Sequence, residues 1–142
     1  MTADRAGVER HLRELRRLVV LLRRHSGVRP EELAQDLERA LMIERALHLA
    51  IQNVLNVGNH LLAARGQVVP DTYEQILVGL GRVGIIPADF AERIRRMAGL
   101  RNVLVHAYLD VDPVRLVDAL SRIDDFEAFA RHVLTELGRS SG

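Results

Sequence analysis

Residues 41–62 read LMIERALHLAIQNVLNVGNHLL, a stretch that is apolar around much of the circumference of the helix that it predicts. A helix of this kind packs on more than one side, so we expect it at the centre of the protein. It forms part of a longer predicted helix over residues 30–65, with a break near Asp36. Pro30 suits the first position of a helix, and Gly66 suits the position just after its end.

Helical patterns continue on both sides of this stretch. Apolar residues recur at spacings of three and four over four further segments, residues 8–24, 72–80, 87–107 and 113–137. Asp71 and Asp112 are candidate N-caps, and Pro113 suits a first helical turn. Leu, Ala, Arg and Glu dominate the composition, which is typical of helical proteins. We therefore expect an all-α fold, an up-and-down bundle of four main helices plus one short helix, in one domain over residues 1–142.

The composition excludes several kinds of chemistry. All 20 basic residues are arginine, so no lysine is available to form a Schiff base. The chain has no cysteine, which excludes thiol catalysis, disulfide bonds and zinc–thiolate sites. The formal net charge of +1 means that any nucleic-acid site is a local patch. The sequence contains no apolar run of membrane-spanning length and no signal peptide, so we expect a soluble, cytoplasmic protein with no membrane partner.

Residues 100–108 read LRNVLVHAY and place three polar groups on an otherwise apolar segment. These groups are Arg101, His106 and Tyr108. An arginine can bind a phosphate through two parallel hydrogen bonds, and a histidine can transfer protons near neutral pH. Together, without a metal, they suffice to cleave RNA through attack of its own 2'-hydroxyl on the adjacent phosphorus.

The spacing of these residues raises a geometric question. In a continuous helix Arg101 and Tyr108 lie on one flank and His106 lies on the other, so Arg101 and His106 do not converge by simple stacking. Either the helix ends near His106, or the length of the arginine closes the gap, or a second copy of the domain completes the site. Val105 is apolar and shares the outward surface with Asn102, as expected for a surface that meets a partner. We favour a homodimer in which two such helices face each other across a cleft.

The pattern Arg-x4-His-x-Tyr, with Asn directly after Arg, resembles the signature of HEPN-superfamily ribonucleases, specifically the HepT-like toxin family. The resemblance includes residues 59–62 (NHLL), residues 84–87 (GIIP) and Asp112, and it extends roughly over residues 8–137. The chain departs from many relatives at one point, because it has Ala107 where they have an acidic residue.

This resemblance implies a compact helical bundle that dimerises and acts as a metal-independent endoribonuclease toxin, with no cofactor. It implies that Arg101 and His106 are catalytic, that Asn102 supports the site, and that Tyr108 is modified with AMP. The modifying enzyme would be a minimal nucleotidyltransferase antitoxin encoded beside the toxin. RNA, a second copy of this chain and this antitoxin are therefore the expected partners.

The predicted central helix carries a polar stripe at spacings of three and four, namely Arg45, His48, Gln52, Asn56 and Asn59. Amide side chains on an apolar helix need hydrogen-bond partners, so we prefer to interpret the stripe as a polar seam between helices. Alternatively it forms the second wall of an RNA cleft, in which case His48, Gln52 and Asn56 contact RNA. Glu44 and His48 could ligate a metal, but the sequence offers no third ligand, and no metal site is predicted.

Three arginines, Arg93, Arg95 and Arg96, precede the motif and form either a solvated face or a guide for RNA phosphates. Two other functions remain open for the whole chain. One is a non-catalytic HEPN module that binds a nucleotidyltransferase or a nucleotide, and the other is a helical dimer with an unrelated ligand. The intact set of Arg101, His106 and Tyr108 favours the ribonuclease.

Overall fold

The structure is a computed structural model that describes residues 4–106 and 111–141. Its helices are α1 (Arg5–Arg23), α2 (Pro30–Ala34), α3 (Leu37–Ala64), α4 (Tyr73–Arg82), α5 (Ala88–Ile94), α6 (Met97–Val105), α7 (Pro113–Leu120) and α8 (Ile123–Ser141). The described residues contain no strand, which confirms the predicted all-α fold class. None of these helices is both long enough and apolar enough to cross a membrane.

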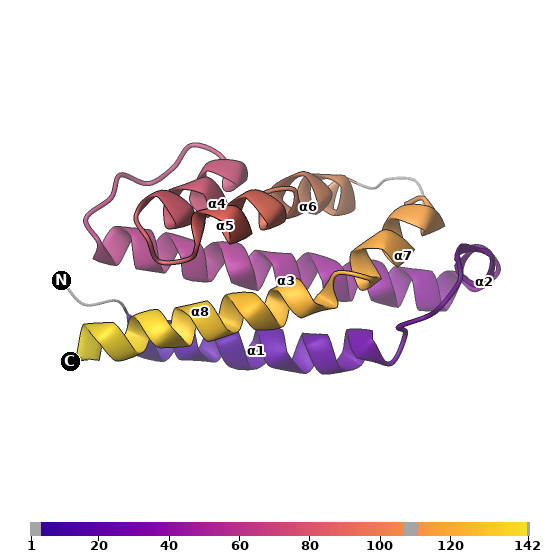
Figure 1. The fold of residues 1–142 in the computed structure, drawn as a ribbon. Coiled ribbons are helices and arrows are strands. Elements are labelled where there is room, and N and C mark those ends of the chain that lie inside the picture. The colour runs from indigo at the N-terminus through magenta and orange to yellow at the C-terminus, as the bar shows by residue number, and fades with distance from the viewer. Residues whose placement is uncertain (1–3, 107–110, 142) are drawn as a thin grey trace.

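The long helix α3 runs along the middle of the bundle (Figure 1). Helices α4, α5 and α6 lie on one side of it, and α1 and α8 lie on the other. It packs against α1, α4, α6 and α7, so it is covered on several sides, as its apolar sequence predicts. Among its buried side chains, Leu47 and Ile51 have no exposed surface at all.

The ends of several helices follow from local hydrogen bonds. The predicted break near Asp36 is confirmed, because the Asp36 carboxylate accepts a hydrogen bond from the Arg39 N–H at 3.1 Å and begins α3. Gly66 follows the end of α3 with a φ angle of 72°, a left-handed conformation that glycine adopts without strain. Thr72, and not the predicted Asp71, caps α4, because its hydroxyl accepts a hydrogen bond from the Gln75 N–H at 3.2 Å.

Two predicted helices are each divided in the structure. The segment predicted as one helix over residues 87–107 is α5 followed by α6, and residues 113–137 form α7 and then α8. At the first break the Ala98 N–H bonds to the carbonyl of Arg95, three residues back, which tightens the turn. The breaks let each half pack on a different helix: α5 on α4, α6 on α3, α7 on α2 and α8 on α1. Apolar spacing persists across such breaks, so the sequence pattern alone did not reveal them.

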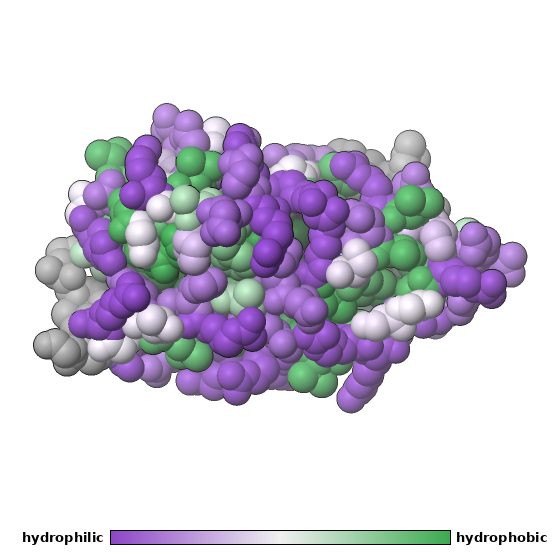
Figure 2. Space-filling view, in the orientation of Figure 1, coloured by the Kyte–Doolittle hydropathy of each residue, from purple (hydrophilic) through white to green (hydrophobic). Residues whose placement is uncertain are grey.

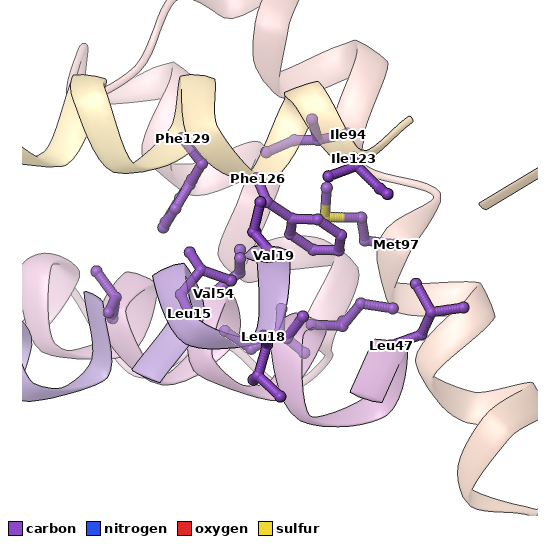
Figure 3. Close-up of a cluster of buried hydrophobic side chains, with 14 of the residues drawn as sticks. Leu15, Leu18, Val19, Leu47, Val54, Ile94, Met97, Ile123, Phe126 and Phe129 are labelled. Atoms are coloured by element: carbon purple, nitrogen blue, oxygen red, sulfur yellow. The ribbon is translucent and has the colours of Figure 1, made fainter. Parts of the chain in front are cut away.

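The core forms where α1, α3 and α8 meet the segment that joins α5 to α6. Figure 3 shows Leu15 and Val19 of α1, Val54 of α3 and Phe126 of α8 in one cluster of buried side chains. Met97, the first residue of α6, joins the same cluster with 8% of its surface exposed. The start of the motif helix is therefore anchored in the core.

Gly58 sets how closely α3 and α4 approach each other. A Cβ atom at this position would lie 2.6 Å from Ile76 Cγ2 and 3.1 Å from Leu80 Cδ1. Both of these side chains are buried and belong to α4. A larger residue at position 58 would therefore displace α4 from α3.

We predict that Gly58→Ala lowers the free energy of unfolding relative to Gly99→Ala by about 1–3 kcal/mol, the usual cost of overpacking a core. The matched Gly99 lies in α6 and would have no atom within 4 Å of its Cβ, so there the substitution gains only helix propensity, up to about 1 kcal/mol. Urea unfolding of both variants measures the difference. Equal stabilities for the two would show that α3 and α4 are not in this close contact.

Candidate functional site

The motif helix α6 lies on α3 by one face and is open on the other. Leu100, Val103 and Leu104 are partly buried and pack against the core, as predicted from their spacing. Asn102 is exposed, and Val105 retains 37% of its surface, so both lie on the outward face as predicted. The site therefore has one side fixed by the bundle and one side accessible to a partner or a substrate.

Arg101 is held in place by contacts from two other helices. Its Nε donates a hydrogen bond to Gln52 Oε1 of α3 at 3.3 Å. Its guanidinium carbon lies 4.3 Å from the centre of the Tyr73 ring of α4, within the range of a cation–π interaction. Its Nη1 donates to Asn102 Oδ1 at 3.3 Å. A guanidinium has five N–H donors, so several remain for a phosphate once its orientation is set.

His106 lies at the end of the motif helix. Helix α6 ends at Val105, and the His106 backbone N–H still bonds to the carbonyl of Asn102 at 3.1 Å. The helix thus ends next to His106, as the first of the three possibilities supposes. The imidazole is exposed. His106 is five positions after Arg101, which corresponds to about 140° around the helix axis, so the two side chains leave α6 on different flanks.

The polar stripe of α3 lies beside Arg101. Gln52 accepts the hydrogen bond from Arg101 and donates one to Asn56 Oδ1 at 3.0 Å. The first of these bonds joins α6 to α3, as the predicted seam requires, whereas the second lies within α3. The Gln52 end of the stripe therefore borders the candidate site. Asn59 continues the stripe, but its buried Oδ1 has no hydrogen-bond partner in residues 4–106 and 111–141.

His48 is a second imidazole near Arg101. Burial lowers its pKa, and the positive charges of Arg45 and Arg101 lower it further. Arg45 Nη1 lies 3.2 Å from His48 Nδ1 and, as a guanidinium, can only donate. Nδ1 is therefore the acceptor, and in the neutral ring Nε2 carries the proton. His48 can thus offer a hydrogen bond from Nε2 without carrying a charge.

Comparison with known proteins places this chain in a family. The sequence model described as "Ribonuclease HepT-like" matches residues 8–133. The chain belongs to the HepT-like ribonuclease family. A curated relative, the tRNA nuclease HepT of Aphanizomenon flos-aquae (strain 2012/KM1/D3), is 26% identical over 127 residues, which span 89% of this chain and 86% of the relative.

Two solved structures are similar to the HepT-like fold of this chain. One is a cytosolic protein of unknown function, YutE from Bacillus subtilis, with a TM-score of 0.79, 20% identity, and coverage of 95% of this chain and 91% of that one. The other is a tri-AMPylated HEPN toxin of Shewanella oneidensis in complex with an MNT antitoxin. Its TM-score is 0.81 with 18% identity, and the match covers 95% of this chain and 99% of that one.

The arginines that precede the HepT-like motif differ in their surroundings. Arg93 pairs with Asp125 at 3.0 Å, and Arg95 pairs with both Glu74 and Glu92. Arg96 is exposed and forms no ion pair with any residue that the structure describes. Of the three, Arg96 can take a phosphate without leaving a carboxylate unpaired.

Tyr108, the expected site of AMP modification, lies outside the described residues. Tyr73, which supports the guanidinium of Arg101, was not singled out from the sequence. No spacing rule connects the first residue of α4 with the motif helix, so only the packing of α4 beside α6 reveals this contact.

The possibility of a metal at Glu44 and His48 gains no support from the surrounding residues. Within the described ranges, no group of three or more histidine, aspartate or glutamate side chains could hold a metal ion. Of the amide side chains of the stripe, Gln52 forms hydrogen bonds with Asn56 and with Arg101.

We predict that His48 contributes to the pH dependence of stability. Its pKa is lowered in the folded protein, so as the pH falls below about 6.5 the unfolded chain takes up the proton first. The stability contributed by neutral His48 is thus complete above about pH 6.5 and is lost as the pH falls through the lowered folded pKa. His48→Gln should therefore lose less free energy of unfolding on acidification than the wild type.

Urea unfolding near neutral pH and at about pH 5 tests this expectation. The pKa of His25 is also lowered, by burial and by Arg39, but His25 is present in both proteins and its contribution cancels. An equal loss of stability in wild type and His48→Gln would contradict the account of His48.

Proposed function

We propose that this HepT-like protein is a metal-independent endoribonuclease toxin of a toxin–antitoxin pair, in which Arg101 and His106 are the catalytic residues and Asn102 supports the site. The observation that carries this proposal is the orientation of Arg101 by Gln52 and Tyr73 in a chain of the HepT-like ribonuclease family. A guanidinium held on two sides has less conformational entropy to lose when it binds a phosphate.

The proposed reaction is attack of a ribose 2'-oxygen on the adjacent phosphorus. The new O–P bond closes a 2',3'-cyclic phosphate, and the bond from phosphorus to the 5'-oxygen of the next nucleotide breaks. His106 either accepts the proton of the 2'-hydroxyl or donates a proton to the leaving 5'-oxygen. Arg101 stabilises the negative charge that builds up on the non-bridging oxygens. The products carry a 2',3'-cyclic phosphate and a 5'-hydroxyl.

We propose that the site is completed in a homodimer. Arg101 leaves α6 toward α4 and α3, whereas His106 lies on the opposite flank at the exposed end of the helix. The outward face between these flanks carries Asn102 and Val105. Two copies that meet along this face would bring the guanidinium of one protomer to the imidazole of the other. Each such site would hold one Arg101 and one His106, and His106 would perform one of the two proton transfers while solvent performs the other.

The residues around the motif are candidates for RNA binding. His48 offers a neutral Nε2–H, and Gln52 and Asn56 lie on the same stripe of α3. Arg96 offers an unpaired charge, whereas Arg93 and Arg95 would bind phosphates only by exchanging their carboxylate partners.

The proposed second partner is a minimal nucleotidyltransferase antitoxin that transfers AMP to Tyr108. The phenolic oxygen would attack the α-phosphorus of ATP, and pyrophosphate would leave. Support comes from the Shewanella HEPN toxin of similar fold, which is tri-AMPylated and in complex with an MNT antitoxin. The phosphate of the added AMP is an anion that would compete with the RNA phosphate for Arg101.

A non-catalytic HEPN module that binds a nucleotidyltransferase or a nucleotide is the second candidate function. The observation in its favour is that Arg101 and His106 leave α6 on different flanks of one protomer. Such a module would bind its partner but would leave RNA intact.

Incubation of the purified protein with RNA tests the ribonuclease. Wild type should cleave in the presence of EDTA, and the products should end in a 2',3'-cyclic phosphate. We expect Arg101→Ala to reduce the rate by about 10²–10³-fold and His106→Ala by about 10²–10⁴-fold. Arg16→Ala and His25→Ala change the same residue types elsewhere and should leave the rate unchanged. Loss of cleavage in the presence of EDTA would contradict the mechanism. If the wild type leaves RNA intact, the non-catalytic module becomes the better supported function.

The role of Tyr108 is tested with the cognate nucleotidyltransferase and ATP. Tyr108→Phe should keep its ribonuclease activity, because the mechanism does not use the phenol, and should resist inactivation by the antitoxin enzyme. Mass spectrometry should find AMP on the wild type and not on the variant. A Tyr108→Phe protein that the partner enzyme still inactivates completely would refute this role.

A further inference from the structure

A groove of about 670 Å³ lies beside the motif helix, on the opposite flank from Arg101. Helices α5 and α6 form one wall, and α7 with the start of α8 forms the other. The floor consists of apolar side chains, among them Met97, Leu100, Ala119 and Phe126. Figure 2 shows a hollow with a hydrophobic floor between hydrophilic rims on this face. The volume is within the usual range for ligand sites, about 300–1,000 Å³.

The rim of the groove carries more positive than negative charge. Five arginines and three carboxylates line it. Each carboxylate lies in an ion pair with one of these arginines: Arg93–Asp125, Arg95–Glu74 and Arg122–Asp118. The two remaining arginines are Arg96 on the α6 wall and Arg115 on the α7 wall. Both are exposed, and neither forms an ion pair within the described part of the chain. The groove therefore fits an anionic ligand that also has an apolar part.

Gly99 keeps the α6 wall of this groove open. It lies within the helix, where glycine costs about 1 kcal/mol relative to alanine. A Cβ at this position would meet no atom within 4 Å, so packing within the protein does not require a glycine. Because Gly99 lines the groove, a larger side chain there would occupy the space of a ligand.

His106 lies outside the groove, further along the helix that forms one of its walls. Arg96, Gly99 and His106 are separated by three and seven residues, so they share one flank of α6. Arg96 and Gly99 line the groove, and His106 lies further along the same flank at the end of the helix. A strand that enters between Arg96 and Arg115 would therefore be led to the imidazole.

We propose that this groove binds the segment of single-stranded RNA next to the scissile bond, with a phosphate between Arg96 and Arg115 and a base on the apolar floor. This inference rests on the proposed ribonuclease function. The strand must be single, because bases stacked within a duplex cannot reach an apolar floor, whereas unpaired bases can be inserted into a pocket.

The test measures binding of a short single-stranded RNA whose 2'-hydroxyls are methylated, so that it cannot be cleaved by 2'-OH attack. Fluorescence anisotropy is recorded at several salt concentrations. Arg96→Ala/Arg115→Ala should weaken binding about tenfold and reduce the slope of log K against log salt by about 0.7, the contribution of one neutralised phosphate of a single strand. The matched control, Arg10→Ala/Arg16→Ala, removes the same charge from exposed positions of α1.

The control decides between a local and a general charge effect. Binding that weakens only in the groove variant supports the proposal. Equal weakening in both variants, or none in the groove variant, overturns it.

A second pair of variants tests the open space itself. Gly99→Phe should weaken RNA binding by filling the groove, whereas Gly138→Phe, at an exposed helical glycine of α8 with an equally open Cβ, should bind as the wild type does. The groove could instead be filled by a second copy of this chain, and sedimentation of both variants tests this alternative. If Gly99→Phe changes the oligomeric state and leaves RNA binding by the protein intact, the groove is an interface between protomers and the proposal fails.

The proposed RNA-binding groove and the proposed ribonuclease function can be contradicted independently of each other. If the wild type cleaves RNA and both groove variants bind RNA normally, the proposed role of the groove is wrong and the proposed ribonuclease function stands. If the wild type binds the methylated RNA through the groove but never cleaves natural RNA, the groove is an RNA-binding site and the proposed ribonuclease function is wrong.

Discussion

The attachment of α6 to α3 and α4 through Arg101 is the constraint on which the candidate site depends. The hydrogen bond to Gln52 and the stacking on Tyr73 draw the guanidinium to one flank of the helix. The groove and His106 lie on the opposite flank of α6. This short helix therefore separates the surface around Arg101 from the surface of the groove. Gly58 matters for the same reason, because the close approach of α3 and α4 sets where Tyr73 lies.

The sequence predicts most of the fold because the central helix is so strongly apolar. Residues 41–62 could be buried only within a bundle, and the cap at Asp36 and the turn at Gly66 follow from local chemistry. The breaks before Met97 and Ile123 could not be predicted in this way. They depend on which neighbour each half packs against, and an apolar pattern carries no information about its partner.

The candidate site is predictable from the sequence only where it depends on residues that are close together in the chain. The residue types and spacing of Arg101 and His106 indicate phosphate chemistry, and helical geometry separates them onto two flanks. The contact of Arg101 with Tyr73 and the pairing of Arg93 with Asp125 are not visible in spacing, because each joins elements distant in the chain. The sequence likewise does not predict that Arg115 lines a groove, because this depends on the position of α7 across the groove from α6.

The most direct test of the central claim, that the guanidinium of one protomer and the imidazole of another meet at a single phosphodiester, is complementation. Arg101→Ala and His106→Ala proteins are refolded together, checked for helical structure by circular dichroism, and incubated with RNA. In a mixed dimer one shared site keeps an intact arginine and an intact histidine. The account predicts that the mixture cleaves RNA although each variant alone does not. A mixed dimer that is as inactive as its parents would contradict it.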